Sequence, residues 1–209
     1  MTEAAVAAAP PAPAASVDVR ALPSYGFGAC SLMWWGTLGL MLIEGTAFGL
    51  AIAMYFFVRT LAAAWPIDAA MPDPVWGTLN TLLLLASLWP NQMAKRAAEA
   101  RNRPRARFWL CICLLAALAF LVVRALEFGA LNVSWHASAY GSVVWLLMGL
   151  HTTHLITDTA DTAVLAVLLF SGPFDARRFV DVSENAWYWY FVVATWLPIY
   201  AVVYWAPRF

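Results

Sequence analysis

Long apolar runs alternate with short polar connectors along this chain. The five runs lie near residues 31–59, 76–97, 107–129, 137–170 and 185–206. Each reaches the roughly 20 residues that an α-helix needs to cross about 30 Å of hydrocarbon. The connectors hold turn signals such as Arg103-Pro104 and Gly172-Pro173. The pattern predicts an all-α integral membrane protein, in which residues 29–209 form one bundle of five transmembrane helices.

Residues 1–28 differ in character, because most of residues 2–16 are Ala or Pro. This segment lacks the positively charged start, long apolar run and cleavage site of a secretory signal. Its biased composition is typical of a flexible tail that does not join a packed core. We therefore expect a flexible N-terminal tail before the bundle.

Composition supports the membrane assignment and excludes other classes. Of the 209 residues, 63% are hydrophobic and 11% are charged, whereas soluble domains are about 45–50% apolar and about 25% charged. This excludes a soluble enzyme and a disordered protein. The 12 basic and 12 acidic residues cancel, which argues against nucleic-acid binding. The three cysteines, Cys30, Cys111 and Cys113, form no disulfide framework and no CxxC pair.

Basic residues predict the orientation of the bundle. Nine of the twelve fall on one side of a five-span chain, namely Arg20, Lys95, Arg96, Arg101, Arg103, Arg105, Arg107, Arg177 and Arg178. Because Lys and Arg gather in cytoplasmic loops, we expect the N-terminus in the cytoplasm and the C-terminus outside. The loop between the second and third spans is interpreted as an ordinary positive-inside loop, with an anionic-lipid site as the alternative.

One carboxylate lies in the middle of the first span. A charge at this depth costs about 2.5–3.5 kcal/mol on insertion scales, so Glu44 needs a partner or a role. It is either a carboxyl that fastens helices through hydrogen bonds or a proton-relay group. Gly45 and Gly49 follow it with GxxxG spacing, which permits close packing of another helix.

The third span carries two opposite charges. Arg124 and Glu127 are three residues apart, so they share one face of a helix. We expect them to neutralise each other as a structural ion pair near the outer interface.

The fourth span carries a polar stripe. His151, His154, Asp158 and Asp161 follow spacings of 3, 4 and 3, which keep them within an arc of about 80°. Such a stripe must face the bundle interior or another protein. A hydrogen-bonded His–Asp network is favoured, while proton transfer and a metal shared by His154 and Asp158 are alternatives. The stripe rises about 15 Å, too far for one coordination sphere.

The ligands of redox centres do not come together in this sequence. Of its three histidines, His151 and His154 share a span and His136 lies at the start of that span, whereas bis-histidine haem ligation normally uses two helices. There is no cysteine pair beside a histidine for copper and no Gly-rich phosphate loop. We therefore predict no catalytic, cofactor-binding or metal-binding residue in this chain, which indicates an accessory subunit.

Six stretches, in this order, resemble subunit III of the haem–copper terminal oxidases, the superfamily of cytochrome c and quinol oxidases. They are Ile43–Phe48, Leu79–Leu84, Arg124–Phe128, Gly149–His154 with its G-x-H-x-x-H pattern, Trp187–Phe191 and Val202–Trp205. The resemblance covers about residues 31–206 and fits the five-helix form of the family.

Two departures from the family pattern stand out. The longer members have seven helices, so a lipid cleft that involves the first pair is in doubt for this chain. In the last helix, Tyr190 and Val193 stand where the family usually has histidine and aspartate. The charge network that those residues serve is absent here or reassigned to Asp158 or Asp161.

The resemblance implies a multi-pass protein of the bacterial cytoplasmic (inner) membrane. It implies a non-catalytic subunit that packs against the catalytic subunit I, together with subunit II, and supports assembly, stability and proton uptake during oxygen reduction. Haem and copper would belong to the partner subunit, and this chain would hold none, although a bound phospholipid and contacts with membrane lipids are expected. Two alternatives remain open. One is a similar accessory protein of a nitric oxide reductase, and the other is an autonomous transporter or proton channel that uses Glu44 and the stripe.

Overall fold

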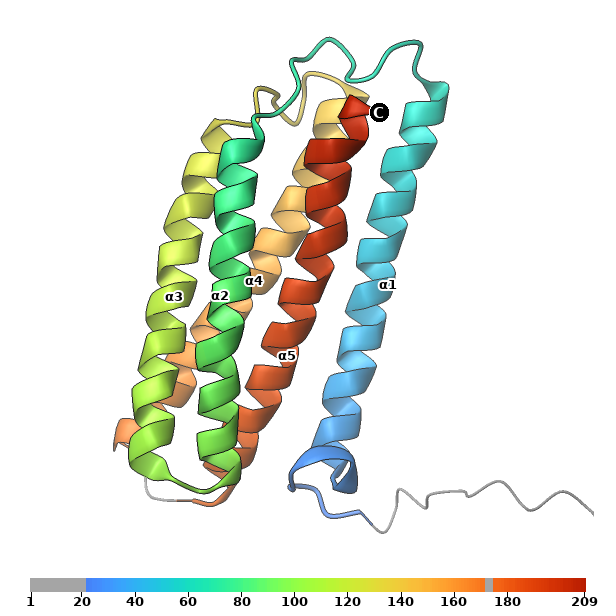
Figure 1. Cartoon of the computed structure of the whole chain (residues 1–209). Coiled ribbons are helices and arrows are strands. Elements are labelled where there is room, and N and C mark those ends of the chain that lie inside the picture. Colours follow the sequence, from blue (N-terminus) through green and yellow to red (C-terminus); the bar gives the residue numbers. More distant parts are fainter. Residues whose placement is uncertain (1–21, 172–174) are drawn as a thin grey trace, which may run out of the picture.

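The computed structural model describes residues 22–171 and 175–209. Within these residues the chain is helical, with five long helices that run side by side (Figure 1): α1 (Leu32–Leu61), α2 (Pro74–Glu99), α3 (Arg103–Gly129), α4 (Ala139–Ser171) and α5 (Arg177–Tyr200). A π-helical turn, Ala201–Trp205, and a 3₁₀ turn, Ala206–Arg208, extend α5. The all-α class and the five helices are confirmed.

Four of the five helices are long and apolar enough to cross a membrane, namely α1, α3, α4 and α5 with its extension to Arg208. The remaining helix, α2, has 26 residues but carries polar side chains along its length. Two of them, Asn80 and Asn91, are buried because α2 packs between α3 and α5. Its neighbours therefore cover the polar groups that make α2 less apolar than the other helices.

Local sequence signals set the helix starts. The side chains of Ser31, Asp73 and Asn102 accept hydrogen bonds from backbone N–H groups in the first turns of α1, α2 and α3, as N-caps do. The start of α5 is Arg177, eight residues before the last apolar run. That first part of α5 is amphipathic, so it packs as a helix although its mean hydropathy is low.

The helices form a bundle in which α4 and α5 are central. Helix α1 packs mainly against α4 and α5, α2 packs against α3 and α5, and α3 also packs against α4. Figure 1 shows α1 at one edge and α3 at the other. The α2–α3 connection and the start of α5 share one end, called here the basic end, and the C-terminus lies at the opposite end.

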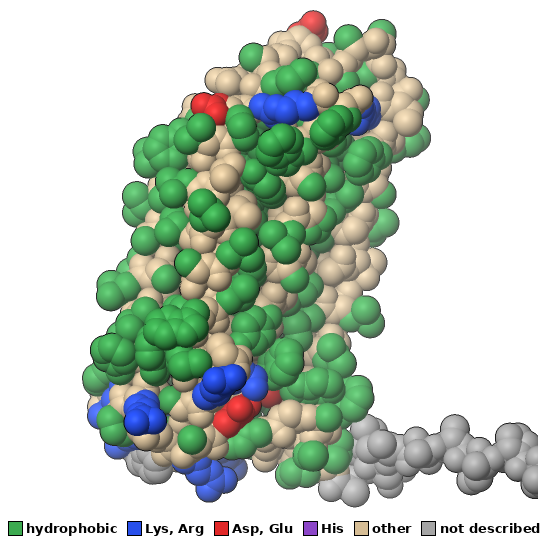
Figure 2. All heavy atoms as spheres, in the orientation of Figure 1, with side chains coloured by type: hydrophobic (Ala, Val, Ile, Leu, Met, Phe, Trp, Pro, Cys, Tyr) green, Lys and Arg blue, Asp and Glu red, His purple; other side chains and the backbone are tan. Residues whose placement is uncertain are grey.

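The surface has the character expected of a protein in lipid. Hydrophobic side chains cover the middle of the face in Figure 2, and charged side chains gather toward its two ends. Many large apolar residues are more than a third exposed, which suits a hydrocarbon solvent. Of the expected tail, residues 1–21 lie outside the described residues, and Pro23 and Ser24 accept hydrogen bonds from the first turn of α1.

Helix α1 is packed unevenly along its length. Its buried residues are Phe48, Ala51 and Tyr55, all in the half toward the C-terminal end of the bundle. The half nearer the basic end, from Leu32 to Ala47, buries none. The second half of α1 therefore packs closely against α4 and α5. A groove lies between these helices beside the first half of α1.

Candidate functional site: buried charges of the helix bundle

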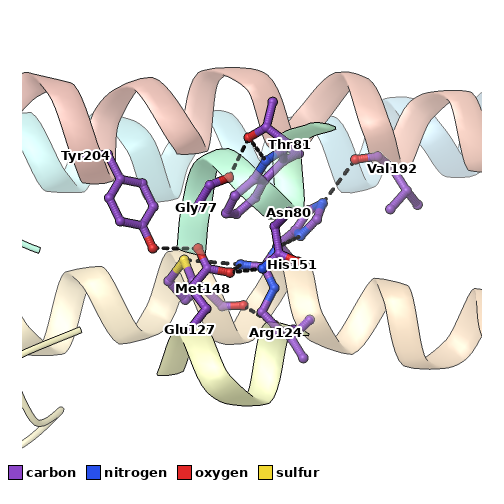
Figure 3. Close-up of polar contacts among 11 residues, drawn as sticks. Gly77, Asn80, Thr81, Arg124, Glu127, Met148, His151, Val192 and Tyr204 are labelled. Carbon is purple, nitrogen blue, oxygen red and sulfur yellow. Dashed lines mark hydrogen bonds and ion pairs between the residues drawn. The ribbon is translucent and has the colours of Figure 1, made fainter. Parts of the chain in front are cut away.

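The most buried charges form one cluster, the central network of Asn80, Arg124, Glu127, His151 and Tyr204 (Figure 3). Arg124 Nη1 lies 2.9 Å from Glu127 Oε2, and both side chains are 99% buried or more. Glu127 also accepts hydrogen bonds from Asn80 Nδ2 and from the Tyr204 hydroxyl. The network joins α2, α3, α4 and the extension of α5, and it contains the expected ion pair.

His151 connects this pair to α5. Arg124 Nη2 lies 3.3 Å from His151 Nδ1, and His151 Nε2 lies 3.0 Å from the carbonyl oxygen of Val192. Because a guanidinium can only donate, Nδ1 must accept. The ring proton then sits on Nε2 and is donated to Val192. The contacts thus assign a neutral imidazole that serves as a fixed connector.

Aromatic rings enclose the guanidinium. Arg124 Cζ lies 4.0 Å from the ring centre of Trp196 and 5.0 Å from that of Phe120, which gives cation–π stabilisation in a dry site. Trp196 Nε1 donates to Thr81 Oγ1 at 2.8 Å. The central network is therefore enclosed by rings and polar groups, although among the described residues Arg124 Nε and Asn80 Oδ1 have no hydrogen-bond partner.

The approach of Tyr204 depends on a glycine. A Cβ atom at Gly77 of α2 would collide with the ring of Tyr204. Without a side chain at position 77, the ring can cross α2 and bring its hydroxyl to Glu127. Sequence reasoning gave Gly77 no role, because the tyrosine it accommodates is more than a hundred residues away.

Glu44 is part of a second group, between α1, α4 and α5. The Tyr188 hydroxyl donates to Glu44 Oε2 at 2.8 Å, and His154 Nε2 lies 3.6 Å from Glu44 Oε1. Phe48 packs on the His154 ring with centroids 4.8 Å apart. Gly45 is in ordinary contact with Phe191, whereas no atom lies within 4 Å of a Cβ built at Gly49. Among the described residues, Gly49 therefore makes no close helix contact.

A third group holds the two aspartates of the stripe. Asn185 Nδ2 donates to Asp158 Oδ1 at 3.3 Å and to Asp161 Oδ2 at 3.2 Å, and Thr162 Oγ1 donates to Asn185 Oδ1 at 3.2 Å. Asp158 also borders a small polar cavity that Cys113 lines. One amide thus serves two carboxylates.

The polar stripe of α4 therefore divides among three sets of partners. His151 belongs to the central network, His154 faces Glu44, and Asp158 and Asp161 share Asn185. In the part of the chain that the structure describes, no group of three or more His, Cys, Asp or Glu side chains could hold a metal ion. His154 and Asp158 point to different partners, so the structure gives no support to an ion shared by the two.

The unpaired half of α1 borders a groove, the acidic groove, of about 620 Å³ between α1, α4 and α5. Its charged lining residues are Glu44, Asp158, Asp161, Arg178, Asp181 and Glu184. Sequence reasoning did not single out Glu184, which was expected in a connector and instead lies two turns into α5. The two departures from the family lie elsewhere: Val193 is buried in the core, and the Tyr190 hydroxyl donates to Gln92.

A bundle of long apolar helices with many large apolar side chains on its surface is the architecture of a multi-pass membrane protein. The family description "Cytochrome c oxidase subunit III" matches residues 37–207. The chain therefore belongs to the cytochrome c oxidase subunit III family.

Similar proteins carry the same family name. "Cytochrome c oxidase subunit 3" of Arabidopsis thaliana is 30% identical over 175 residues, which cover 79% of this chain and 66% of that protein. The protein of this name from Pylaiella littoralis is 26% identical over 174 residues, or 79% of this chain and 64% of the relative. That from Gallus gallus is 30% identical over 147 residues, or 69% and 56%. The chain spans about two thirds of the length of the first relatives it matches.

Proposed function

We propose that this chain is a non-catalytic subunit of an aerobic respiratory terminal oxidase of the cytochrome c oxidase type. Its membership of the subunit III family over residues 37–207 carries the proposal. Relatives with this family name are subunits, so the expected partners are a haem–copper subunit I and a subunit II. Haem and copper would belong to those partners.

The contribution we propose is to pack against the catalytic subunit and to support its assembly, its stability and its proton uptake. The geometry supports a packing role because the central network ties four helices together and is closed by its own partners. For proton uptake, the suitable groups are Glu44 and His154, which lie 3.6 Å apart at the edge of the acidic groove. We propose them as the proton-exchanging groups between the helices.

We further propose that the basic end faces the cytoplasm of a bacterial inner membrane. Eight described Lys and Arg residues lie at the end of α2, in the α2–α3 connection, or at the start of α3 or α5, namely Lys95, Arg96, Arg101, Arg103, Arg105, Arg107, Arg177 and Arg178. Such clustering favours the cytoplasmic side. The C-terminus would then lie outside.

The test is purification of the tagged chain in a gentle detergent, followed by a reduced-minus-oxidised spectrum. We expect a haem-containing partner with oxidase activity. A nitric oxide reductase in the same fraction would keep the subunit role and change the complex. A colourless, monodisperse chain without partners would contradict the proposal, and flux through that chain in proteoliposomes, lost in Glu44→Gln, would favour a transporter.

A further inference from the structure

The acidic groove carries more negative charge than its own donors match. Its charged lining residues are five carboxylic acids and one guanidinium, and Arg178 reaches only Asp181 among them, at 3.4 Å. Asp158 and Asp161 share the single amide of Asn185. Although Glu44 accepts a hydrogen bond from Tyr188, the groove therefore has more carboxylates than donors to match them.

Glu184 shows this shortage most clearly. It is 3% exposed, lines the groove, and neither of its carboxylate oxygens accepts a hydrogen bond. Two donors lie within reach of Glu184, but in this structure the Thr37 hydroxyl donates to the Met33 carbonyl and Lys95 pairs with Glu99. A buried carboxylate without donors is costly, so this position favours a ligand that brings N–H groups and positive charge.

The depth of the carboxylates indicates how such a ligand is carried. With a rise of about 1.5 Å per residue, Glu184 lies about 10 Å from the basic end of α5, and Asp158 and Glu44 lie about 20 Å from the ends of α4 and α1. A headgroup layer is only about 5–8 Å thick on each side of the hydrocarbon. A lipid headgroup would therefore reach only the part of the groove near Glu184 and leave Asp158 and Glu44 without a partner, whereas a side chain on a transmembrane helix reaches the deeper acids.

The other surfaces of the groove suit a helix. Apolar residues of α1 and α4, among them Leu40 and Val164, line it beside the acids and are exposed. The first half of α1 buries no residue against this chain. An apolar helix with one basic side chain would cover these surfaces and supply the missing donors.

We propose that the acidic groove receives a lysine or arginine side chain from a transmembrane helix of a neighbouring subunit, which pairs with Glu184 and Asp158. The inference rests on the function proposed above, because it needs a partner subunit in the membrane. The inference specifies the surface by which this subunit docks and the positive charge on the partner that this surface binds.

The test compares the intact complex with a version that carries Glu184→Gln and Asp158→Asn. We expect the double variant to dissociate from its haem-containing partner about thirty-fold more readily on dilution, as when one member of a buried charge pair is removed. The matched control is Asp68→Asn, in the connection between α1 and α2, which should dissociate like wild type. Equal retention of all three would overturn the inference.

A second measurement keeps the test independent of the folding of the variant. In the otherwise unchanged chain, p-benzoylphenylalanine replaces Leu40 and is cross-linked by light in the complex. A peptide from the partner's transmembrane segment with Lys or Arg would support the inference, and adducts with lipid alone, or none, would overturn it. If the unmodified chain retains no haem-containing partner, the proposed function fails as well, so the two failures are distinguishable.

Discussion

The central network and the acidic groove differ in how well each surrounds its buried charges with hydrogen-bond donors. In the central network, Arg124 and Glu127 are fully buried, and each has several polar partners or rings around it. In the acidic groove, Glu184 is almost as buried but accepts no hydrogen bond. The two regions share a fold and a solvent, and they differ in how many donors face each carboxylate.

The number of donors around a buried charge separates charges that stabilise the fold from charges that are available to a partner. A buried ion pair stabilises a fold only when further hydrogen bonds satisfy both members, because desolvation otherwise outweighs the attraction. The central network meets that condition for the Glu127 carboxylate, which has three partners within the chain, whereas Arg124 Nε has no hydrogen-bond partner. The acidic groove does not meet the condition, so the missing donors are expected from outside, and stability and association measurements should separate the two regions.

The largest effect is expected at Glu127. Changing Glu127 to Leu leaves the Arg124 guanidinium buried without its counter-ion, and the free energy of unfolding of the purified chain should fall by about 3–5 kcal/mol. The double variant Arg124→Met with Glu127→Leu should recover most of the loss, since it removes both charges. Equal losses in the single and double variants would contradict a central role for the ion pair.

A smaller loss is expected at Gly77. Gly77→Ala places a methyl group against the Tyr204 ring, and overpacking of this kind costs about 1–3 kcal/mol. The control is Gly36→Ala, where no atom lies within 4 Å of the new Cβ and helix propensity favours alanine. Denaturant titration of both variants in detergent would measure the difference, and equal stability would show that Tyr204 does not need the space.

The shared amide of Asn185 should have a moderate effect. Asn185→Leu leaves Asp158 and Asp161 without their common donor, so the stability of the chain should fall by roughly 1–2 kcal/mol. Asn185→Asp should be worse, because it adds a third carboxylate to the same place. Thermal unfolding of the two variants shows which is less stable. If Asn185→Asp is the more stable of the two, the Asn185 amide is not the donor that stabilises the two carboxylates.

The smallest effect has the opposite sign. Glu184→Met replaces a buried carboxylate that accepts no hydrogen bond with an apolar side chain of similar size. The isolated chain should become more stable by about 1 kcal/mol, since the desolvation penalty is relieved. A loss of stability comparable to that of Glu127→Leu would show that Glu184 already has donors within the chain. It would contradict the difference between the acidic groove and the central network.

Periodicity and charge spacing were enough to predict the class, the five helices and the Arg124–Glu127 pair. The pair was predictable because its members lie one turn apart on one helix. The start of α5 was missed because its first turns are amphipathic, and a search for apolar runs does not register them.

The partners across helices could not be predicted from one sequence. Nothing local links Glu127 to Tyr204 or Glu44 to Tyr188, since these contacts depend on which helices become neighbours. The α4 stripe illustrates the same limit. Its spacing placed four polar side chains on one face, but His151, His154 and Asp158 contact different partners on neighbouring helices.

An experimental structure of the tagged chain with its partners in a lipid nanodisc would show what fills the acidic groove. We expect a partner helix along the first half of α1, with a Lys or Arg nitrogen within about 4 Å of the Glu184 carboxylate, a salt-bridge distance, and an unchanged Arg124–Glu127 pair. A groove that faces only lipid, or a central network opened by contact with the partner, would contradict this expectation.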